Sequence, residues 1–204
     1  MPLPNRVDPF GNLFATPARG TLMGNRGGKF HTDAQSLTAR RWVSRQWICC
    51  VLDFRGRHRH VWGRYYTELF FLDEVTAFAA GHRPCFECRR ADAEQFAELF
   101  AEPPRGRDRV SAKAMDDVLH AERLDGKAKR IHRLELDRLP DGAMVALDGE
   151  AFALRAGELM RWSPSGYTAG RKPPRGIAVD VLTPPSILSV LKDGYLPLWH
   201  PSAD

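Results

Sequence analysis

Hydrophobic and polar positions in residues 69–90 change their spacing abruptly, and each change predicts a different element. The apolar run 69–71, Leu-Phe-Phe, is typical of a short strand. Asp73 is a preferred N-cap residue, so we expect a helix over residues 74–80. Gly81 suits the left-handed position that ends a helix, and Pro84 prevents the helix from resuming. The pattern therefore predicts strand, helix and tight turn in immediate succession.

The region before this segment is predicted to be mainly β-structure. Residues 1–20 show no periodicity and are rich in Pro, Asn and Gly, which predicts an irregular arm. Residues 21–31 suggest two short strands around a glycine-rich turn at 24–28. Residues 47–54 suggest a strand that turns at 55–57 and pairs with residues 58–62 as a hairpin.

The predicted strand 47–54 carries two adjacent cysteines, which alternation places on opposite faces. Cys50 shares one face with Ile48, and Cys49 shares the other with Asp53. Because a charged residue indicates the wetter face, we expect Cys50 to point toward the core. Neighbouring strand residues cannot both reach one metal ion without distortion, so one of the two cysteines is a candidate ligand and the other is not.

The later part of the chain mixes helix and strand patterns. Residues 91–101 have apolar positions at helical spacing, and Ser111 can cap a helix that we expect to continue to about residue 130. Short alternating segments in 141–166 predict a small antiparallel sheet, followed by a strand at 177–182 and a helix at 184–191. The expected class is α+β, with a zinc-stabilised module over 1–103 and an α+β half over 104–204, joined by a Pro-rich linker at 103–106.

Composition sets broad limits on function. The chain has 204 residues, 43% apolar and 27% charged, which is typical of a globular protein. No run approaches 18 apolar residues, and the N-terminal sequence lacks an apolar signal core, so we expect a cytoplasmic protein without a membrane span. Four cysteines in a chain of this size do not suggest a disulfide scaffold. The net charge of +5 is compatible with nucleic-acid binding.

The C-x-x-C at Cys85 and Cys88 is the strongest chemical signal, and it points to zinc. Two thiolates three residues apart can occupy one edge of a tetrahedral zinc site, with zinc–sulfur bonds of about 2.3 Å. Arg83, Arg89 and Arg90 are expected to favour the thiolates by lowering their pKa. A thioredoxin-like redox pair is the alternative, but it needs a βαβ context that the surroundings do not offer. Two unrelated structural thiols are the remaining interpretation.

The same segment resembles a known zinc module. The matching positions are a Phe-Phe pair fourteen residues before the first cysteine, an Ala-Ala-Gly and an Arg-Pro-Cys-x-x-Cys, namely Phe70, Phe71, Ala79, Ala80, Gly81, Arg83, Pro84, Cys85 and Cys88. This pattern is similar to the Ada-like zinc-binding domain of DNA-alkylation repair and of some nuclease-associated modules. His82 stands where that family usually has Phe or Tyr. The resemblance covers roughly residues 21–90 and is strongest at 69–90.

The resemblance extends weakly to residues 24–31 and suggests further metal ligands. Gly24, Asn25, Lys29, Phe30 and His31 match a string that opens the nuclease-associated modules. His31 is therefore a candidate ligand, together with one of Cys49 and Cys50. Gln35 and Ser36 occupy the region where those modules place another cysteine. The family's methyl transfer needs a nucleophilic cysteine in that first pair, so we do not extend this activity to the chain.

Residues 40–64 combine arginines with aromatic residues in a pattern suited to nucleic acid. Arginine binds phosphate bidentately, and exposed aromatics such as Trp42, Trp47 and Trp62 offer platforms for unpaired bases. The arginines expected to contact phosphates are Arg40, Arg41, Arg55, Arg57, Arg59 and Arg64. A solvated hairpin with core aromatics is the alternative. With the Ada-like resemblance, the pattern favours a zinc-containing nucleic-acid-binding protein in DNA repair or modification.

Two other functions remain open. His120 and Glu122 form an H-x-E that, together with Pro84, Cys85 and Cys88, matches the residues of zinc nucleobase deaminases in reversed order. In that case His120 is the third ligand and Glu122 moves protons. In the second alternative, the protein has a structural or interaction role and zinc only supports its fold.

Overall fold

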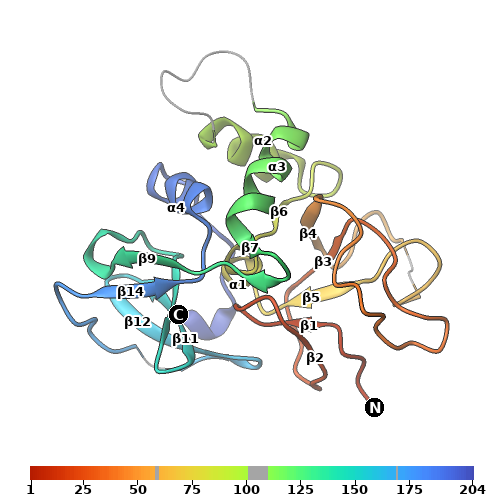
Figure 1. Ribbon diagram of the computed structural model, residues 1–204, viewed down its shortest axis with the longest axis horizontal. Coiled ribbons are helices and arrows are strands. Elements are labelled where there is room, and N and C mark those ends of the chain that lie inside the picture. The colour runs from red at the N-terminus through yellow and green to blue at the C-terminus, as the bar shows by residue number, and fades with distance from the viewer. Residues whose placement is uncertain (58–59, 101–109, 169) are drawn as a thin grey trace.

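Two six-stranded sheets lie on either side of a short central helix in the part of the chain that the structure describes, residues 1–57, 60–100, 110–168 and 170–204 (Figure 1). The structure is a computed structural model. The first sheet has the order β2-β1-β5-β3-β4-β6 and the second β13-β12-β11-β10-β14-β9. The expected α+β class is confirmed.

The first sheet contains β1 (Arg6–Val7), β2 (Leu13–Phe14), β3 (Leu22–Arg26), β4 (Trp47–Val51), β5 (Leu69–Phe71) and β6 (Arg83–Pro84). The N-terminal arm is therefore not wholly irregular, because β1 pairs in parallel with β5. β3 is one strand rather than two, and Gly24 at its centre is required by close packing. A Cβ on Gly24 would lie 2.2 Å from the carbonyl oxygen of Ile48 on β4.

The predicted hairpin between residues 47–54 and 58–62 is wrong. β4 pairs antiparallel with β3 and parallel with β6, so both of its edges are already used. Residues 58 and 59 lie outside the described part of the chain, and residues 60–62 form no strand. The sequence pattern could not show this outcome, because a two-residue strand such as β6 has no periodicity of its own.

Helix α1 (Glu74–Ala79) begins and ends as its sequence predicts. The Asp73 carboxylate accepts a hydrogen bond of 2.9 Å from the backbone N–H of Thr76, and Gly81 has a φ of +79°. All six residues of this helix are buried. Asp73 also accepts from the Tyr167 hydroxyl at 2.9 Å and from the backbone N–H of His200 at 3.1 Å. The N-terminus of α1 is therefore joined to the C-terminal half.

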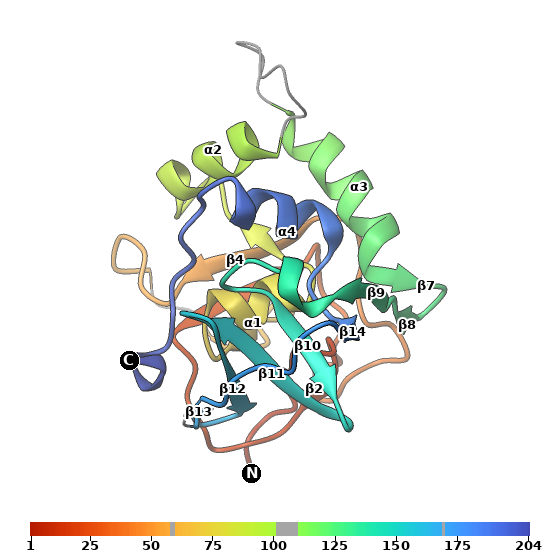
Figure 2. The same ribbon diagram turned by 90° about the vertical axis from the view of Figure 1, so that its left-hand side faces the viewer.

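Three further helices pack side by side near one end of both sheets (Figure 2): α2 (Arg90–Leu99), α3 (Ala112–Arg123) and α4 (Pro185–Lys192). Ser111 caps α3 as expected, by accepting from Ala114 N–H at 3.2 Å. The helix ends seven residues earlier than predicted, because Leu124 is extended and opens a small hairpin of β7 (Leu124–Asp125) and β8 (Ala128–Lys129).

The second sheet contains β9 (His132–Glu135), β10 (Met144–Leu147), β11 (Glu150–Arg155), β12 (Glu158–Ser163), β13 (Gly166–Tyr167) and β14 (Ala178–Val181). Its strands at 144–163 and 178–181 and the helix α4 lie where the alternation and the Pro-rich helix start predict them. β9 was not expected. It is mostly exposed and pairs only with β14 at the sheet edge.

One hydrophobic core extends across the predicted boundary between the two halves. Val75 and Ala79 of α1 pack in the same cluster as Met144 of β10 and Leu182 after β14. The linker expected at 103–106 lies outside the described residues, and the division into 1–103 and 104–204 stays a prediction. No helix among the described residues has the length and apolar character needed to cross a membrane.

Candidate metal centre

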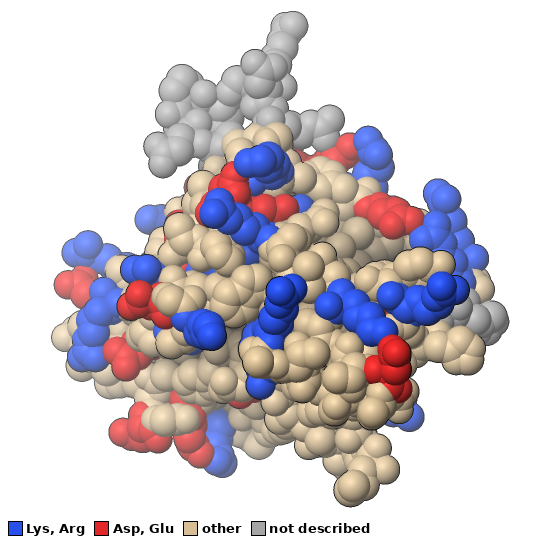
Figure 3. Space-filling view, turned by 45° about the vertical axis from the view of Figure 1, so that its right-hand side comes forward, with Lys and Arg blue, Asp and Glu red and all other residues tan. Residues whose placement is uncertain are grey.

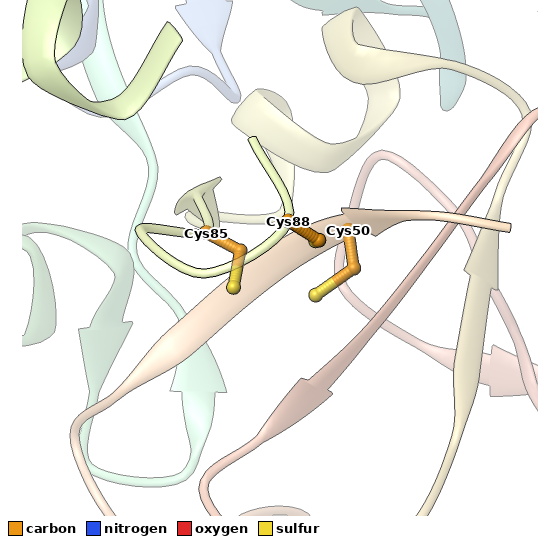
Figure 4. A group of neighbouring side chains, drawn as sticks. All are labelled: Cys50, Cys85 and Cys88. Carbon is orange, nitrogen blue, oxygen red and sulfur yellow. The ribbon is translucent and has the colours of Figure 1, made fainter. Parts of the chain in front are cut away.

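The pairing of β4 with β6 brings three cysteines together. Cys49 is the register partner of Pro84 in this parallel pair, so the next residues on the two strands, Cys50 and Cys85, lie beside each other. The backbone N–H of Cys85 donates to the carbonyl oxygen of Cys49 at 3.0 Å, which fixes this alignment. The chain then turns, and Cys88 reaches the same point from just before α2 (Figure 4).

The sulfur atoms of Cys50, Cys85 and Cys88 form a group that could hold a metal ion. They lie within 4.8 Å of one another, and no histidine or carboxylate of the described residues belongs to the group. A tetrahedral zinc ion with bonds of about 2.3 Å needs sulfur atoms about 3.8 Å apart, so small side-chain adjustments suffice. The Glu87 N–H donates to the Cys85 sulfur at 3.4 Å, which favours charge on that sulfur.

The three thiols cannot all ionise without a cation. Hydrogen bonds from Cys50 and Cys88 lower the pKa of Cys85, while the hydrogen bonds of Cys50 with Cys85 and Cys88, together with burial, raise the pKa of Cys50. The group therefore favours one thiolate that accepts from two thiols. A divalent metal ion would replace the two remaining protons and compensate the charge of three thiolates.

The arginines that flank the C-x-x-C do not supply this compensation, contrary to our expectation from sequence. Arg83 donates to Asp116 on α3 at 2.9 and 2.8 Å. Arg89 donates to Glu74 at 2.6 Å, and Arg90 pairs with Glu94 at 3.2 Å. Each of these cations is matched by a carboxylate, so the low pKa of Cys85 arises from its neighbouring thiols.

Cys49 and Cys50 are both buried, so the expected inward position of Cys50 is confirmed and the assignment of Cys49 to the wetter face was wrong. Cys49 is fully buried in a cluster with Phe30, Leu69 and Phe71. Its sulfur accepts from Arg89 at 3.3 Å rather than joining the thiol group. Cys50 lies on the opposite face, with Met23, Cys85 and Cys88. The exposed Asp53 misled the alternation argument because the strand ends at Val51, before reaching it.

His31 is placed away from the three thiols. Its ring stacks on Trp62 with centroids 5.1 Å apart. Both ring nitrogens already have partners, since Nδ1 lies 2.8 Å from the Thr67 hydroxyl and Nε2 lies 3.1 Å from the Gly63 carbonyl oxygen. The structure therefore gives His31 a role in holding the loop before β5, not a place in the metal group.

His120 and Glu122 do not belong to the thiol group, and their side chains contact different residues. Glu122 accepts from the backbone N–H and the hydroxyl of Ser186, at 3.0 and 2.7 Å, and so caps the N-terminus of α4. His120 lies 3.2 Å from the Arg123 guanidinium and edge-on to Trp42. The reversed H-x-E therefore does not meet the cysteines in space.

The arginines proposed to contact phosphates are exposed where the structure describes them. Arg40, Arg41, Arg55, Arg57 and Arg64 are exposed, whereas Arg59 lies outside the described residues. Arg57 pairs with Glu87 at 2.7 Å. On the face in Figure 3, Lys and Arg side chains spread across the middle of the surface, interspersed with fewer Asp and Glu side chains.

The aromatic residues of this region contradict part of the stacking prediction. Trp47 and Trp62 are buried, and their indole N–H groups donate to the carbonyl oxygens of Ser44 and Glu68. They cannot serve as open platforms for bases. Trp42 is half-buried and Tyr65 is exposed, so these two aromatics remain available.

A cavity of about 530 Å³ opens beside the three cysteines. All three line it, together with polar and aromatic residues that include Gln46, Tyr66 and Glu87. A metal ion bound by three thiolates at this place would have its fourth coordination position within reach of a small molecule or a water molecule.

A second group of functional candidates was missed by sequence reasoning. Arg26, Arg123 and Lys129 line another cavity, of about 470 Å³, on the face of β4 that carries Trp47, opposite the face of Ile48 and Cys50. They come from β3, α3 and β8, so no local motif unites them. The one available signal was His82, which replaces the usual aromatic of the Ada-like pattern and accepts from Arg26 at 3.4 Å.

Comparisons with family models, with curated proteins and with solved structures give no match to this chain. The residues and their geometry are therefore the basis of the proposals that follow.

Proposed function

We propose that this protein binds one zinc ion through Cys50, Cys85 and Cys88 and that it acts on, or in complex with, nucleic acid, most simply DNA. The convergence of the three thiols is the observation that carries the zinc part of the proposal. Soft thiolate ligands select zinc among the common divalent ions of cells. On the basis of the same three thiols we propose that the chain is related to the Ada-like zinc domains, with Cys50 as the ligand that precedes the C-x-x-C.

The zinc would tie the edge of the first sheet to the start of α2. Cys50 belongs to β4, while Cys85 and Cys88 belong to the turn between β6 and α2. Because β6 has only two residues and pairs only with β4, few backbone hydrogen bonds hold it. Metal binding would therefore contribute directly to the stability of this edge.

Adjacent cysteines provide a matched test of the zinc site. We expect about one zinc per chain in protein purified without chelators. Cys50→Ser should lose most of that zinc, whereas Cys49→Ser should retain it even if its melting temperature falls, because Cys49 contacts Arg89 and the core. Wild-type protein without zinc, or equal zinc loss in both variants, would refute the assignment.

The nucleic-acid part of the proposal is supported by the net charge of +5 and by the exposed arginines of residues 40–64. Each phosphate contact should contribute about 0.9 to the slope of log affinity against log salt for duplex DNA. Replacing Arg40, Arg55 and Arg64 by Gln should therefore lower that slope by up to about 2.7.

The second sheet offers a control of equal charge. Arg133 and Arg161 are exposed there, as is Arg138 in the short helical turn after β9, and their replacement by Gln should leave the slope unchanged. Absence of binding at low salt, or the same change in both triple variants, would show that the arginines of residues 40–64 are simply solvated.

A zinc-dependent hydrolytic enzyme is a second candidate, favoured by the 530 Å³ cavity beside the thiols. Three protein ligands leave a position for water, whereas four protein ligands indicate a structural site. X-ray absorption of the zinc-loaded protein should show three sulfur atoms and one oxygen atom for the enzyme. A fourth sulfur or nitrogen neighbour would reject it. Glu122 is not the expected proton carrier, because it caps α4.

A further inference from the structure

Two buried arginines share one aromatic ring on the Trp47 face of β4. The guanidinium carbons of Arg26 and Arg123 each lie 4.1 Å from the ring of Trp47. Arg26 is 2% exposed and Arg123 is 1% exposed. Together with Lys129, these side chains line the cavity of about 470 Å³, whose wall also contains Arg41 and Trp42.

The hydrogen bonds of these three cations go to neutral acceptors. Arg26 donates to the Gly11 carbonyl oxygen at 3.0 Å and to His82. Arg123 donates to the carbonyl oxygens of Gly81 and Arg45 and lies beside His120. Lys129 donates to the carbonyl oxygen of Ala79. The Nε of Arg123 is buried and has no hydrogen-bond partner among the described residues.

Two other buried arginines of this protein are paired with carboxylates. Arg83 forms two hydrogen bonds with Asp116, and Arg89 binds Glu74. Burial of a charge without an opposite charge is costly, so a folded protein normally provides a carboxylate, as it does in these two cases. The cavity-lining cations depart from this rule within the described residues.

Two acidic groups act on these cations without forming an ion pair with them. Asp116 attracts Arg123, but its carboxylate is paired with Arg83. Asp8 attracts Arg26 and Lys129 electrostatically, but its carboxylate accepts from Asn12 at 2.8 and 3.0 Å. Burial raises the pKa of Asp8, although its hydrogen bonds with Asn12 act in the opposite direction. Burial and mutual repulsion lower the pKa of Lys129 to about 7 and that of Arg123 to about 9. Among the described residues, no carboxylate forms a hydrogen bond with any of these three cations.

We propose that this cavity binds the phosphate group of a nucleotide-sized phosphomonoester. Arginine and lysine are the usual phosphate ligands, and the free Nε of Arg123 supplies an unused donor. The volume of about 470 Å³ lies in the range of small-ligand sites and leaves space beyond one phosphate. The half-buried ring of Trp42 on the wall offers a surface on which a base can stack.

The phosphate site does not depend on the metal centre. It lies on the face of β4 that carries Trp47, and none of the three thiols lines it. Zinc content and phosphate binding can therefore be measured separately. Failure of the DNA-binding test would leave this inference intact, because Arg26, Arg123 and Lys129 are not among the arginines replaced in that test.

Calorimetry with three probes tests the site, using adenosine 5′-monophosphate, adenosine and inorganic phosphate at low ionic strength. We expect the nucleotide to bind, phosphate to bind more weakly and adenosine to give no signal. Lys129→Met should weaken nucleotide binding by at least about tenfold, since it removes a charge-assisted contact. Lys113→Met is the matched control, because Lys113 is exposed on α3 and pairs with Asp117.

The melting temperature of Lys129→Met shows whether a loss of binding could instead result from unfolding of the variant. Without ligand, Lys129→Met should melt at the same or a higher temperature than wild type, because repulsion from Arg26 and Arg123 is removed. Phosphate binding as tight as nucleotide binding would overturn the nucleotide-sized occupant. No binding of any probe, or equal nucleotide affinity of Lys129→Met and wild type, would overturn the site itself.

Discussion

The buried pair between Arg83 and Asp116 should be a main support of the turn that carries Cys85. Arg83 lies in β6, two residues before Cys85, and Asp116 lies on α3. The pair is bidentate, with donor–acceptor distances of 2.9 and 2.8 Å, and side-chain exposures of 2% and 9%. Replacing Asp116 by Ala would leave the Arg83 guanidinium buried with a single hydrogen bond, to the Pro84 carbonyl oxygen.

We expect Asp116→Ala to lower the free energy of unfolding by about 3–5 kcal/mol, the typical effect of removing one partner of a buried ion pair. In a chain of this length each kcal/mol corresponds to about 2–4 °C, so the melting temperature should fall by about 6–20 °C. Most of this loss reflects the uncompensated arginine. Burial raises the pKa of Asp116 although Arg83 lowers it, so desolvation opposes the attraction within the pair.

The neighbouring residue supplies the control. Asp117 is on the same helix, but its side chain is 35% exposed and pairs with Arg45 and Lys113 at the surface. Asp117→Ala should cost at most about 1 kcal/mol, because exposed pairs are screened by solvent. Urea unfolding followed by circular dichroism gives both free energies under the same conditions.

A double variant shows whether Asp116→Ala is less stable because it leaves Arg83 uncompensated or because it removes an attraction. Replacing Arg83 by Met and Asp116 by Leu removes both charges, and stability should recover to within about 1–2 kcal/mol of wild type. Equal effects of Asp116→Ala and Asp117→Ala would refute the reasoning. A double variant that is no more stable than Asp116→Ala would show that the pair stabilises by attraction rather than by compensation.

Three further predictions concern the surroundings of the two sites. Glu122→Ala should cost about 0.5–2 kcal/mol, because Ser186 loses its cap on α4, while zinc content measured by metal analysis stays the same. The free energy of unfolding should rise between about pH 7 and pH 10. The pKa of Lys129 is lowered to about 7 in the folded protein, so the unfolded chain binds more protons in this range. Thermal melts of Lys129→Met should show a smaller rise. Gly81→Ala should destabilise by more than about 1 kcal/mol in urea unfolding, because its φ is +79° and a Cβ would lie 2.7 Å from the Cβ of Arg123; unchanged stability would contradict this geometry.

The sequence by itself determined the local elements of the metal region. Asp73, Gly81 and Pro84 fix where α1 begins and ends and where the next turn starts, because capping and backbone restriction act over a few residues. The same is true of Ser111 at the start of α3. The C-x-x-C likewise identified two of the three grouped thiols, since their spacing alone allows both to reach one ion.

Only the tertiary structure decided which other residues join them. The choice of Cys50 over Cys49 depends on the register of β4 against β6, a pairing of two residues that carries no periodic signal. Arg26, Arg123 and Lys129 meet because three separate elements pack around Trp47. Long-range pairing and side-chain packing set these positions, and neither affects local sequence spacing, so the cavity lined by the three cations could be recognised only in the folded chain.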